Sequence, residues 1–139
     1  MLLELKQIHC HYGAMEAVKG VSMEVSEGSI VSLLGANGSG KSTTMKTISG
    51  LMKPTQGEIW FDKQKVDGLP ANKVVSTGMV HVPEGRGLFT EMTVSENIRL
   101  GAYLRKDKDG IAKDIAKFCD RYPILGKRRN ERVMNLSGG

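Results

Sequence analysis

The sequence predicts a mixed α/β fold in which a strand, a glycine-rich loop and a helix follow one another. Residues 30–34 form a short apolar run, which is typical of a strand buried on both faces. A glycine-rich loop follows over 35–42. Met45, Ile48 and Leu51 then recur at helical spacing, and Gly50 is placed to end a helix over about 41–49.

The loop matches the pattern G-x-x-x-x-G-K-[ST], whose chemistry is the binding of a polyphosphate. Glycines let the backbone turn tightly and approach the phosphates, so that its N–H groups form a nest for anionic oxygens. Lys41 is expected to reach the β- and γ-phosphates, Ser42 to ligate Mg²⁺ and Thr43 to add a hydroxyl. A dinucleotide-binding fingerprint is disfavoured because its third glycine is missing. The expected phosphate-binding residues are Gly35, Ala36, Asn37, Gly38, Ser39, Gly40, Lys41, Ser42 and Thr43.

The rest of the chain divides into a first part with strands and a second part that is helical. Alternating residues predict half-buried antiparallel strands over 3–6 and 21–26. Further strands are expected over 58–62 and 78–82, with a short helix over 70–76. Thr93 and Glu96 form a capping box that opens a helix to about residue 103, and another helix is expected over 110–121. We place a lobe boundary near 88–92, giving domains 1–90 and 91–139.

Composition narrows the class of protein. The 139 residues carry a net charge of +5, with basic clusters at 105–108 and 127–132. Few aromatic residues accompany these clusters, so a solvated face or a surface near anionic lipid explains the charge better than nucleic-acid binding. Cys10 and Cys119 lack metal-ligand spacing and are expected to be buried, reduced thiols. No apolar run approaches the roughly 20 residues that span a bilayer.

Two further segments resemble one protein family. Leu136-Ser137-Gly138-Gly139 resembles the signature sequence of ABC ATPases, and it follows both the phosphate loop and the segment 82–89. Pro83-Glu84-Gly85-Arg86 and the stretch 92–97 look like the ATPases of branched-chain amino acid uptake systems. Most ABC ATPases carry glutamine where this chain has Glu84, and glutamate is typical of the branched-chain group.

The resemblance implies roles for residues outside the loop. Tyr12 would stack on adenine, although a half-exposed tyrosine at a strand end is the plain alternative. Glu84 would lie near the γ-phosphate and Mg²⁺, so the implied metal ligands are Ser42 and Glu84 and the implied cofactors are ATP and Mg²⁺. Signature residues Ser137, Gly138 and Gly139 would contact the ATP of a partner. Leu88, Phe89 and Met92 fall where a permease would touch, or they pack the helical lobe.

The implied function is that of an ATP-binding subunit of an ABC importer, which couples ATP binding and hydrolysis to uptake of branched-chain amino acids. Its partners would be a second ABC ATPase subunit, packed head to tail, and transmembrane permease subunits. It would lie peripherally on the cytoplasmic face of the inner (plasma) membrane. Three alternatives remain open: a soluble ABC ATPase acting on nucleic acid or in translation, an ABC transporter ATPase for another substrate, and an unrelated P-loop kinase or NTPase.

The resemblance also predicts that the chain is truncated. Domains of this family are longer, and the Walker B strand with its aspartate and the neighbouring catalytic glutamate would come after Gly139. We therefore expect an ABC-type P-loop NTPase fold with a mixed sheet, an antiparallel β subdomain and the start of a helical lobe. The chain is expected to bind ATP without hydrolysing it, and to expose a sheet edge that invites pairing with another chain.

Overall fold

The computed structural model describes residues 1–85 and 87–136. The chain forms two compact units, Met1–His81 and Val82–Gly139, which are described separately. The division falls several residues before the predicted lobe boundary, and the functional division into 1–90 and 91–139 stays a prediction. Within the described residues, none of the helices is long and apolar enough to cross a membrane.

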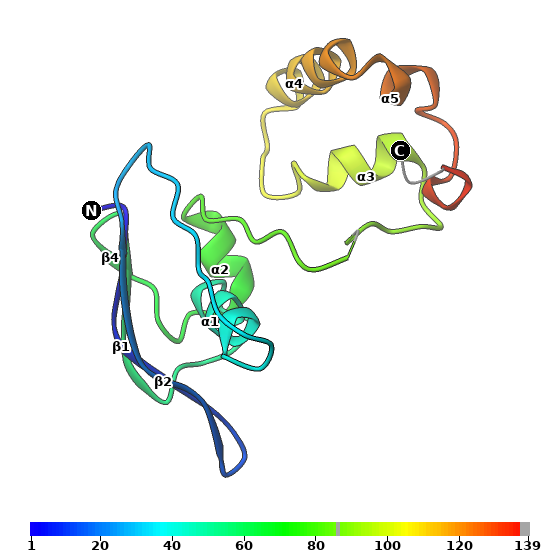
Figure 1. The fold of residues 1–139 in the computed structure, drawn as a ribbon. Coiled ribbons are helices and arrows are strands. Elements are labelled where there is room, and N and C mark those ends of the chain that lie inside the picture. Colours follow the sequence, from blue (N-terminus) through cyan, green and yellow to red (C-terminus); the bar gives the residue numbers. More distant parts are fainter. Residues whose placement is uncertain (86, 137–139) are drawn as a thin grey trace. The chain divides into compact units, whose positions relative to one another are not determined.

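The first unit contains a four-stranded antiparallel sheet (Figure 1). Its strands are β1 (Leu3–Tyr12), β2 (Met15–Val25), β3 (Gln56–Phe61) and β4 (Gln64–Lys65), in the order β2-β1-β3-β4. The predicted strands over 3–6, 21–26 and 58–62 are confirmed, but β1 and β2 are much longer than predicted. Their pairing contains register shifts, and Gln7 has a positive φ of 47°. These bulges interrupt the simple alternation that would have shown the full length of the strands.

Helices α1 (Lys41–Ile48) and α2 (Ala71–Ser76) lie on the same side of this sheet (Figure 1). The buried residues that pack between sheet and helices are mostly aliphatic: Leu5, Ile8, Cys10, Val18, Ile48, Ile59 and Val66. The thiol of Cys10 lies 3.1 Å from the hydroxyl of Thr47, which donates to the Thr43 carbonyl at 2.8 Å. This polar contact within an apolar core fixes α1, and with it the loop before α1, against β1.

Two predicted strands do not form. Residues 30–34 and 78–82 have no regular secondary structure, and their apolar side chains are largely exposed: Ile30 is 96% exposed, Leu34 88%, Val80 73% and Val82 83%. The prediction of a strand was therefore wrong for both segments, and the prediction of burial on both faces was wrong for 30–34. A strand exists only when a neighbour accepts its backbone hydrogen bonds. In the described residues the strands β1 to β4 pair with one another, and neither segment has a partner strand.

The second unit is helical, as predicted. It contains α3 (Val94–Leu100), α4 (Lys108–Arg121), α5 (Pro123–Lys127) and a 3₁₀ turn over Val133–Asn135. The capping box is confirmed: the Glu96 N–H donates to the Thr93 hydroxyl at 3.2 Å, and the Glu96 carboxylate accepts from the Thr93 N–H at 2.8 Å. Helix α3 ends three residues earlier than predicted, because the chain turns over 101–104.

Helix α4 has the predicted apolar stripe, but the stripe is only partly covered. Ile111, Ile115 and Cys119 are half-buried. Phe118 is exposed, and its ring contacts that of Tyr122 at a tilt of 53°, with ring centroids 5.0 Å apart. The prediction of two buried thiols holds for Cys10 and is wrong for Cys119, although both cysteines are free. Helix α5 was not predicted; its Pro123 occupies the first turn, where a missing N–H does no harm.

Candidate nucleotide-binding site

The glycine-rich loop folds back on its own lysine. The Lys41 ammonium donates hydrogen bonds of 2.8 Å to the carbonyl oxygens of both Gly35 and Ala36. The Ser39 N–H donates to Ala36 at 3.2 Å, which closes a tight turn inside the loop. The positive charge of Lys41 is thus held beside the loop by two carbonyl oxygens, whose place phosphate oxygens can take.

Helix α1 starts directly at this lysine. Its first turn contains no acidic residue, so its N–H groups and positive dipole end are not compensated by a carboxylate of that turn. The Thr44 hydroxyl donates back to the Gly40 carbonyl at 2.9 Å, and this bond secures the junction of loop and helix. Sequence reasoning passed over Thr44 because the motif pattern ends before it.

The β1–β2 hairpin lies against the start of α1. Gly40 has φ 90°, and a Cβ placed on it would lie 2.5 Å from the Ala17 carbonyl oxygen and 3.2 Å from the Val18 side chain. Ala17 is the extra residue of a bulge in β2, since Cys10 pairs with Val18 while His11 pairs with Glu16. The bulge therefore forms the contact with the loop, a role that the sequence motif did not reveal.

Tyr12 lies at the end of this hairpin, opposite Met15. Alternate side chains of a strand share one face, so Tyr12 is on the face of β1 that carries Cys10, which is the face packed against α1. Its side chain is 47% exposed, and that of Met15 is 64% exposed. The structure thus brings an exposed aromatic ring and the phosphate loop to the same region of the first unit, although 23 residues separate Tyr12 from Gly35.

The hairpin carries a second polar contact. Nδ1 of His9 lies 2.6 Å from a carboxylate oxygen of Glu16, and this hydrogen bond holds the pKa of Glu16 below its ordinary value. Next to it, Nδ1 of His11 lies 2.9 Å from the Thr55 hydroxyl. These bonds join β1 to β2 and to the turn before β3 close to Tyr12.

The other predicted site residues are placed as follows. Ser42 is in the first turn of α1, and the neighbouring Thr43 is 8% exposed, with its carbonyl bonded to Thr47. Glu84 belongs to the second unit, so the structure does not relate it to the loop. Ser137, Gly138 and Gly139 lie outside the described residues, as does Arg86. Leu88 and Phe89 are 49% and 61% exposed, and Met92 is half-buried.

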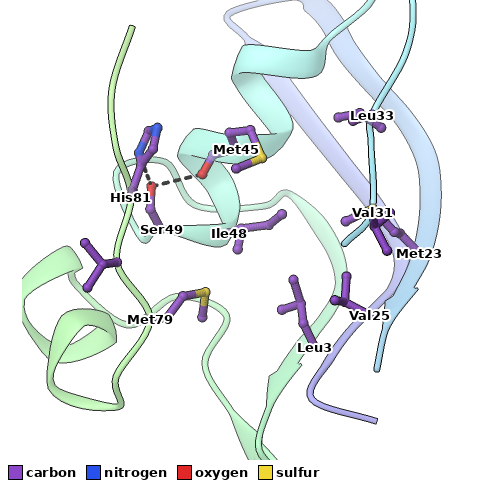
Figure 2. Close-up of a pocket in the computed structure, with 11 residues that line it drawn as sticks. Leu3, Met23, Val25, Val31, Leu33, Met45, Ile48, Ser49, Met79 and His81 are labelled. Carbon is purple, nitrogen blue, oxygen red and sulfur yellow. Dashed lines mark hydrogen bonds between the residues drawn. The ribbon is translucent and has the colours of Figure 1, made fainter. Parts of the chain in front are cut away.

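A separate cavity of about 250 Å³ lies beside the C-terminal half of α1 (Figure 2). Its lining is apolar apart from Ser49 and His81. The Ser49 hydroxyl donates to the Met45 carbonyl at 2.9 Å, and its oxygen lies 3.0 Å from Nδ1 of His81, within hydrogen-bond distance (Figure 2). Val31 and Met79 also line the cavity, so segments 30–34 and 78–82 both border it. With no lysine or arginine in its lining, this cavity is a packing space and not a polyphosphate site.

The donor set of the loop suits a magnesium–nucleotide complex. The hydroxyl of Ser42, next to Lys41, is a hard oxygen donor of the kind that would suit Mg²⁺, which prefers few protein ligands together with substrate phosphates. Among residues 1–85 and 87–136, no three His, Cys, Asp or Glu side chains gather into an all-protein metal site.

The fold and the loop together define an ATP-binding cassette. Residues 18–139 match the sequence profile of the ABC transporter family, and the chain belongs to this family. A nucleotide-free ATP-binding cassette from an ABC transporter superposes with a TM-score of 0.82 at 25% identity, over 99% of this chain and 59% of that one. A cassette in its ADP conformation superposes with a TM-score of 0.80 at 25% identity over the same shares. The predicted ABC-type fold is thereby confirmed.

The curated relatives include several importer subunits. The branched-chain amino acid transport ATP-binding protein BraG of Pseudomonas aeruginosa is 36% identical over 99% of this chain and 59% of its own length. The xylose/arabinose import ATP-binding protein XylG of Sulfolobus acidocaldarius is 37% identical over 99% of this chain and 57% of its own length. The chain therefore spans somewhat over half the length of these relatives.

Proposed function

We propose that this chain binds Mg–ATP as part of an ATP-binding subunit of an ABC importer for branched-chain amino acids. The observation that carries the proposal is the phosphate loop itself. Lys41, held at 2.8 Å by the Gly35 and Ala36 carbonyls, stands at the start of a helix whose first turn lacks acidic residues. Membership of the ABC family supports ATP as the expected polyphosphate.

In the proposed complex, the phosphates lie on the loop N–H groups of residues 35–43 and displace the carbonyls that hold Lys41. Tyr12 stacks on the adenine, a contact that contributes on the order of 1–3 kcal/mol in other base-binding proteins. Ser42 and Glu84 are the proposed ligands of Mg²⁺. The metal, when bound, neutralises phosphate charge and fixes the geometry of the phosphates.

The proposed partners follow from the relatives. A dimeric ATP-binding cassette in a post-hydrolysis state, bound to ADP and Pi, superposes with a TM-score of 0.78 at 26% identity. We propose a similar pairing here, in which Ser137, Gly138 and Gly139 contact the partner's ATP. Transmembrane permease subunits are the second class of partner, and the proposed location is the cytoplasmic face of the plasma membrane.

Branched-chain amino acids are preferred as cargo because that description recurs among the relatives, including BraG of Pseudomonas aeruginosa and LivG of Salmonella typhimurium. Other relatives have different cargo in their names, namely xylose/arabinose and spermidine/putrescine. Glu84 supports the branched-chain assignment through the resemblance alone. Uptake measured with permease and binding protein from the same source would decide between these substrates.

The basic clusters at 105–108 and 127–132 give little support to nucleic-acid binding, because several of their arginines form ion pairs within the chain. Arg105 is paired with Asp107 at 2.5 Å and with Asp114 at 2.6 Å. Arg132 lies 3.4 Å from Glu91, and Arg128 lies 3.8 Å from Glu131. A guanidinium group that is paired with a carboxylate of the same chain contributes less to phosphate binding than an unpaired guanidinium group does.

Calorimetric titration of the chain with Mg–ATP, Mg–triphosphate and adenosine tests the proposal. We expect ATP to bind more tightly than triphosphate, and triphosphate more tightly than adenosine, because the loop supplies most of the binding. Absence of any heat with ATP and triphosphate under conditions where the chain is folded would reject nucleotide binding.

We further propose that the 139-residue chain does not turn ATP over. Phosphoryl transfer needs a fixed metal, a group that orients water and charge stabilisation at the γ-phosphate, and Lys41 and Ser42 serve only part of this requirement. Phosphate release should equal that of the Lys41→Ala variant, which controls for contaminating ATPases. Steady release well above that control would show that other residues of the chain complete the site.

A further inference from the structure

The side chain of Asn97 in α3 binds the backbone of a neighbouring loop in both directions. Its Nδ2 donates to the Phe89 carbonyl at 2.9 Å, and its Oδ1 accepts from the Phe89 N–H at 2.9 Å. Nδ2 also donates to the Thr93 carbonyl at 3.0 Å. Asparagine is a poor helix former, so its presence within α3 is explained by these bonds to the loop rather than by helix stability.

The same loop is paired with the segment that leads into Leu136 and the signature. The Met134 N–H donates to Thr90 and the Val133 N–H to Met92, both at 3.0 Å. In the other direction, the N–H groups of Val94 and Ser95 donate to Glu131 and Arg129, at 3.0 and 2.9 Å. Thr93 and Arg132 form an antiparallel bridge between these pairs. Segments 88–95 and 129–136 are thus joined along their length.

These two segments also supply the core of the helical unit. Val94 is 3% exposed and Val133 is 9% exposed, and they are the buried apolar side chains in the described part of the second unit. One comes from each segment. Helix α4, in contrast, has no buried residue. The paired segments, which include the first residue of α3, therefore carry the buried apolar side chains of the unit, and α4 and α5 carry none.

Because the segments are antiparallel, the exposed residues Leu88 and Phe89 lie at the same end of the pair as Met134 and Leu136, which lead into the signature. Asn97 fixes the carbonyl of Phe89, and the following carbonyls of Thr90 and Met92 are the acceptors for Met134 and Val133. A change in the backbone at Phe89 therefore moves the acceptors that hold the segment before the signature.

We propose that Asn97 is a positioning residue that locks segments 88–95 and 129–136 into one body, so that a partner bound at Leu88 and Phe89 is mechanically linked to the segment that ends at Leu136. That the partner at Leu88 and Phe89 is a permease subunit rests on the proposed function. The lock itself is a property of this chain, and it is testable without nucleotide or partner.

Amide hydrogen exchange followed by NMR on the 139-residue chain tests the lock. In Asn97→Ala, the amides of Phe89, Val133 and Met134 should exchange about tenfold faster or more, as expected for the loss of two ordinary hydrogen bonds. The Val66 amide, which donates to Ile59 in the first unit at 2.8 Å, should be unchanged.

The matched control is Thr93→Ala, which removes the N-cap of the same helix. It should speed exchange at the Glu96 amide, whose acceptor is lost, and leave Phe89 protected. Asn97→Asp is the second variant, since it keeps the acceptor for the Phe89 N–H and loses the donor to the Phe89 carbonyl. It should leave Phe89 protected and still speed exchange at Val133 and Met134.

Three results would overturn the proposal. The first is faster exchange at Phe89 alone in Asn97→Ala. The second is exchange at Val133 and Met134 in Asn97→Asp that is as slow as in the parent chain, and the third is an equal loss of protection across the whole unit in the Asn97 and Thr93 variants. Because ATP titration plays no part in this experiment, its outcome is independent of whether the chain binds nucleotide.

Discussion

Gly40, the residue before α1, lies directly against Ala17 of β2. A Cβ on Gly40 would be only 2.5 Å from the Ala17 carbonyl oxygen, and the φ of Gly40 is 90°. The phosphate loop is therefore shaped from outside by a bulge in the hairpin as well as by its own glycines. The same contact places the hairpin end, with Tyr12, beside the loop.

This contact predicts that two neighbouring glycines differ in their tolerance to substitution. Gly38 has a similar φ of 82°, but a Cβ there would meet nothing within 4 Å. Alanine at either position should cost about 1–2 kcal/mol because of the left-handed backbone. Gly40→Ala should cost roughly a further 1–3 kcal/mol, as the hairpin must move away. Urea unfolding of both variants measures the difference, and equal destabilisation would mean that the hairpin contact is not tight.

Lys41→Ala should weaken Mg–ATP binding about tenfold to a hundredfold. Charge-assisted hydrogen bonds contribute about 1.5–3 kcal/mol, and each 1.4 kcal/mol is a factor of about ten in affinity. Calorimetric titration gives the two dissociation constants. Lys46→Ala is the matched control, because Lys46 is an exposed lysine in the last turn of the same helix and should not affect binding. Equal losses in both variants would indicate a general charge effect.

Tyr12→Ala should weaken ATP binding and leave inorganic triphosphate binding unchanged. In the proposed complex the ring contacts the base and not the phosphates, and stacking contributes on the order of 1–3 kcal/mol. Competition against a fluorescent ATP analogue measures both ligands, and Tyr12→Phe should retain the affinity because the ring remains. A parallel loss for ATP and triphosphate would point to a disturbed hairpin instead.

Acidification should loosen the start of α3 through Glu96. Hydrogen bonds from the Thr93 backbone N–H and then from its hydroxyl hold the pKa of Glu96 below its ordinary 4.5. A lowered folded pKa gives stability that is complete above the unfolded value and is lost as the pH falls from about 4.5 through the folded value.

Glu96→Gln isolates this effect, since glutamine keeps the capping geometry and does not titrate. Exchange at the α3 amides should accelerate on acidification in the parent chain and change less in the variant. Identical pH profiles for the two proteins would show that the charge of Glu96 does not stabilise the helix.

The sequence by itself determined the local features. The G-x-x-x-x-G-K-S loop, helix α1, the capping box of Thr93 and Glu96 and the apolar stripe of α4 all depend on residues close together in the chain, so their patterns could be read directly. The family resemblance also came from short motifs. Among the site residues, Lys41 and its loop were apparent from the sequence alone, whereas Tyr12 needed the resemblance.

Tertiary structure decided what depends on distant partners. The apolar runs 30–34 and 78–82 have the composition of strands, but a strand needs a neighbour for its backbone hydrogen bonds, and neither run has one among the described residues. Ala17 became part of the site through a bulge that no motif records, and Asn97 acquired its role from a loop eight residues away. These contacts join segments that the sequence keeps apart, so only the folded chain could reveal them.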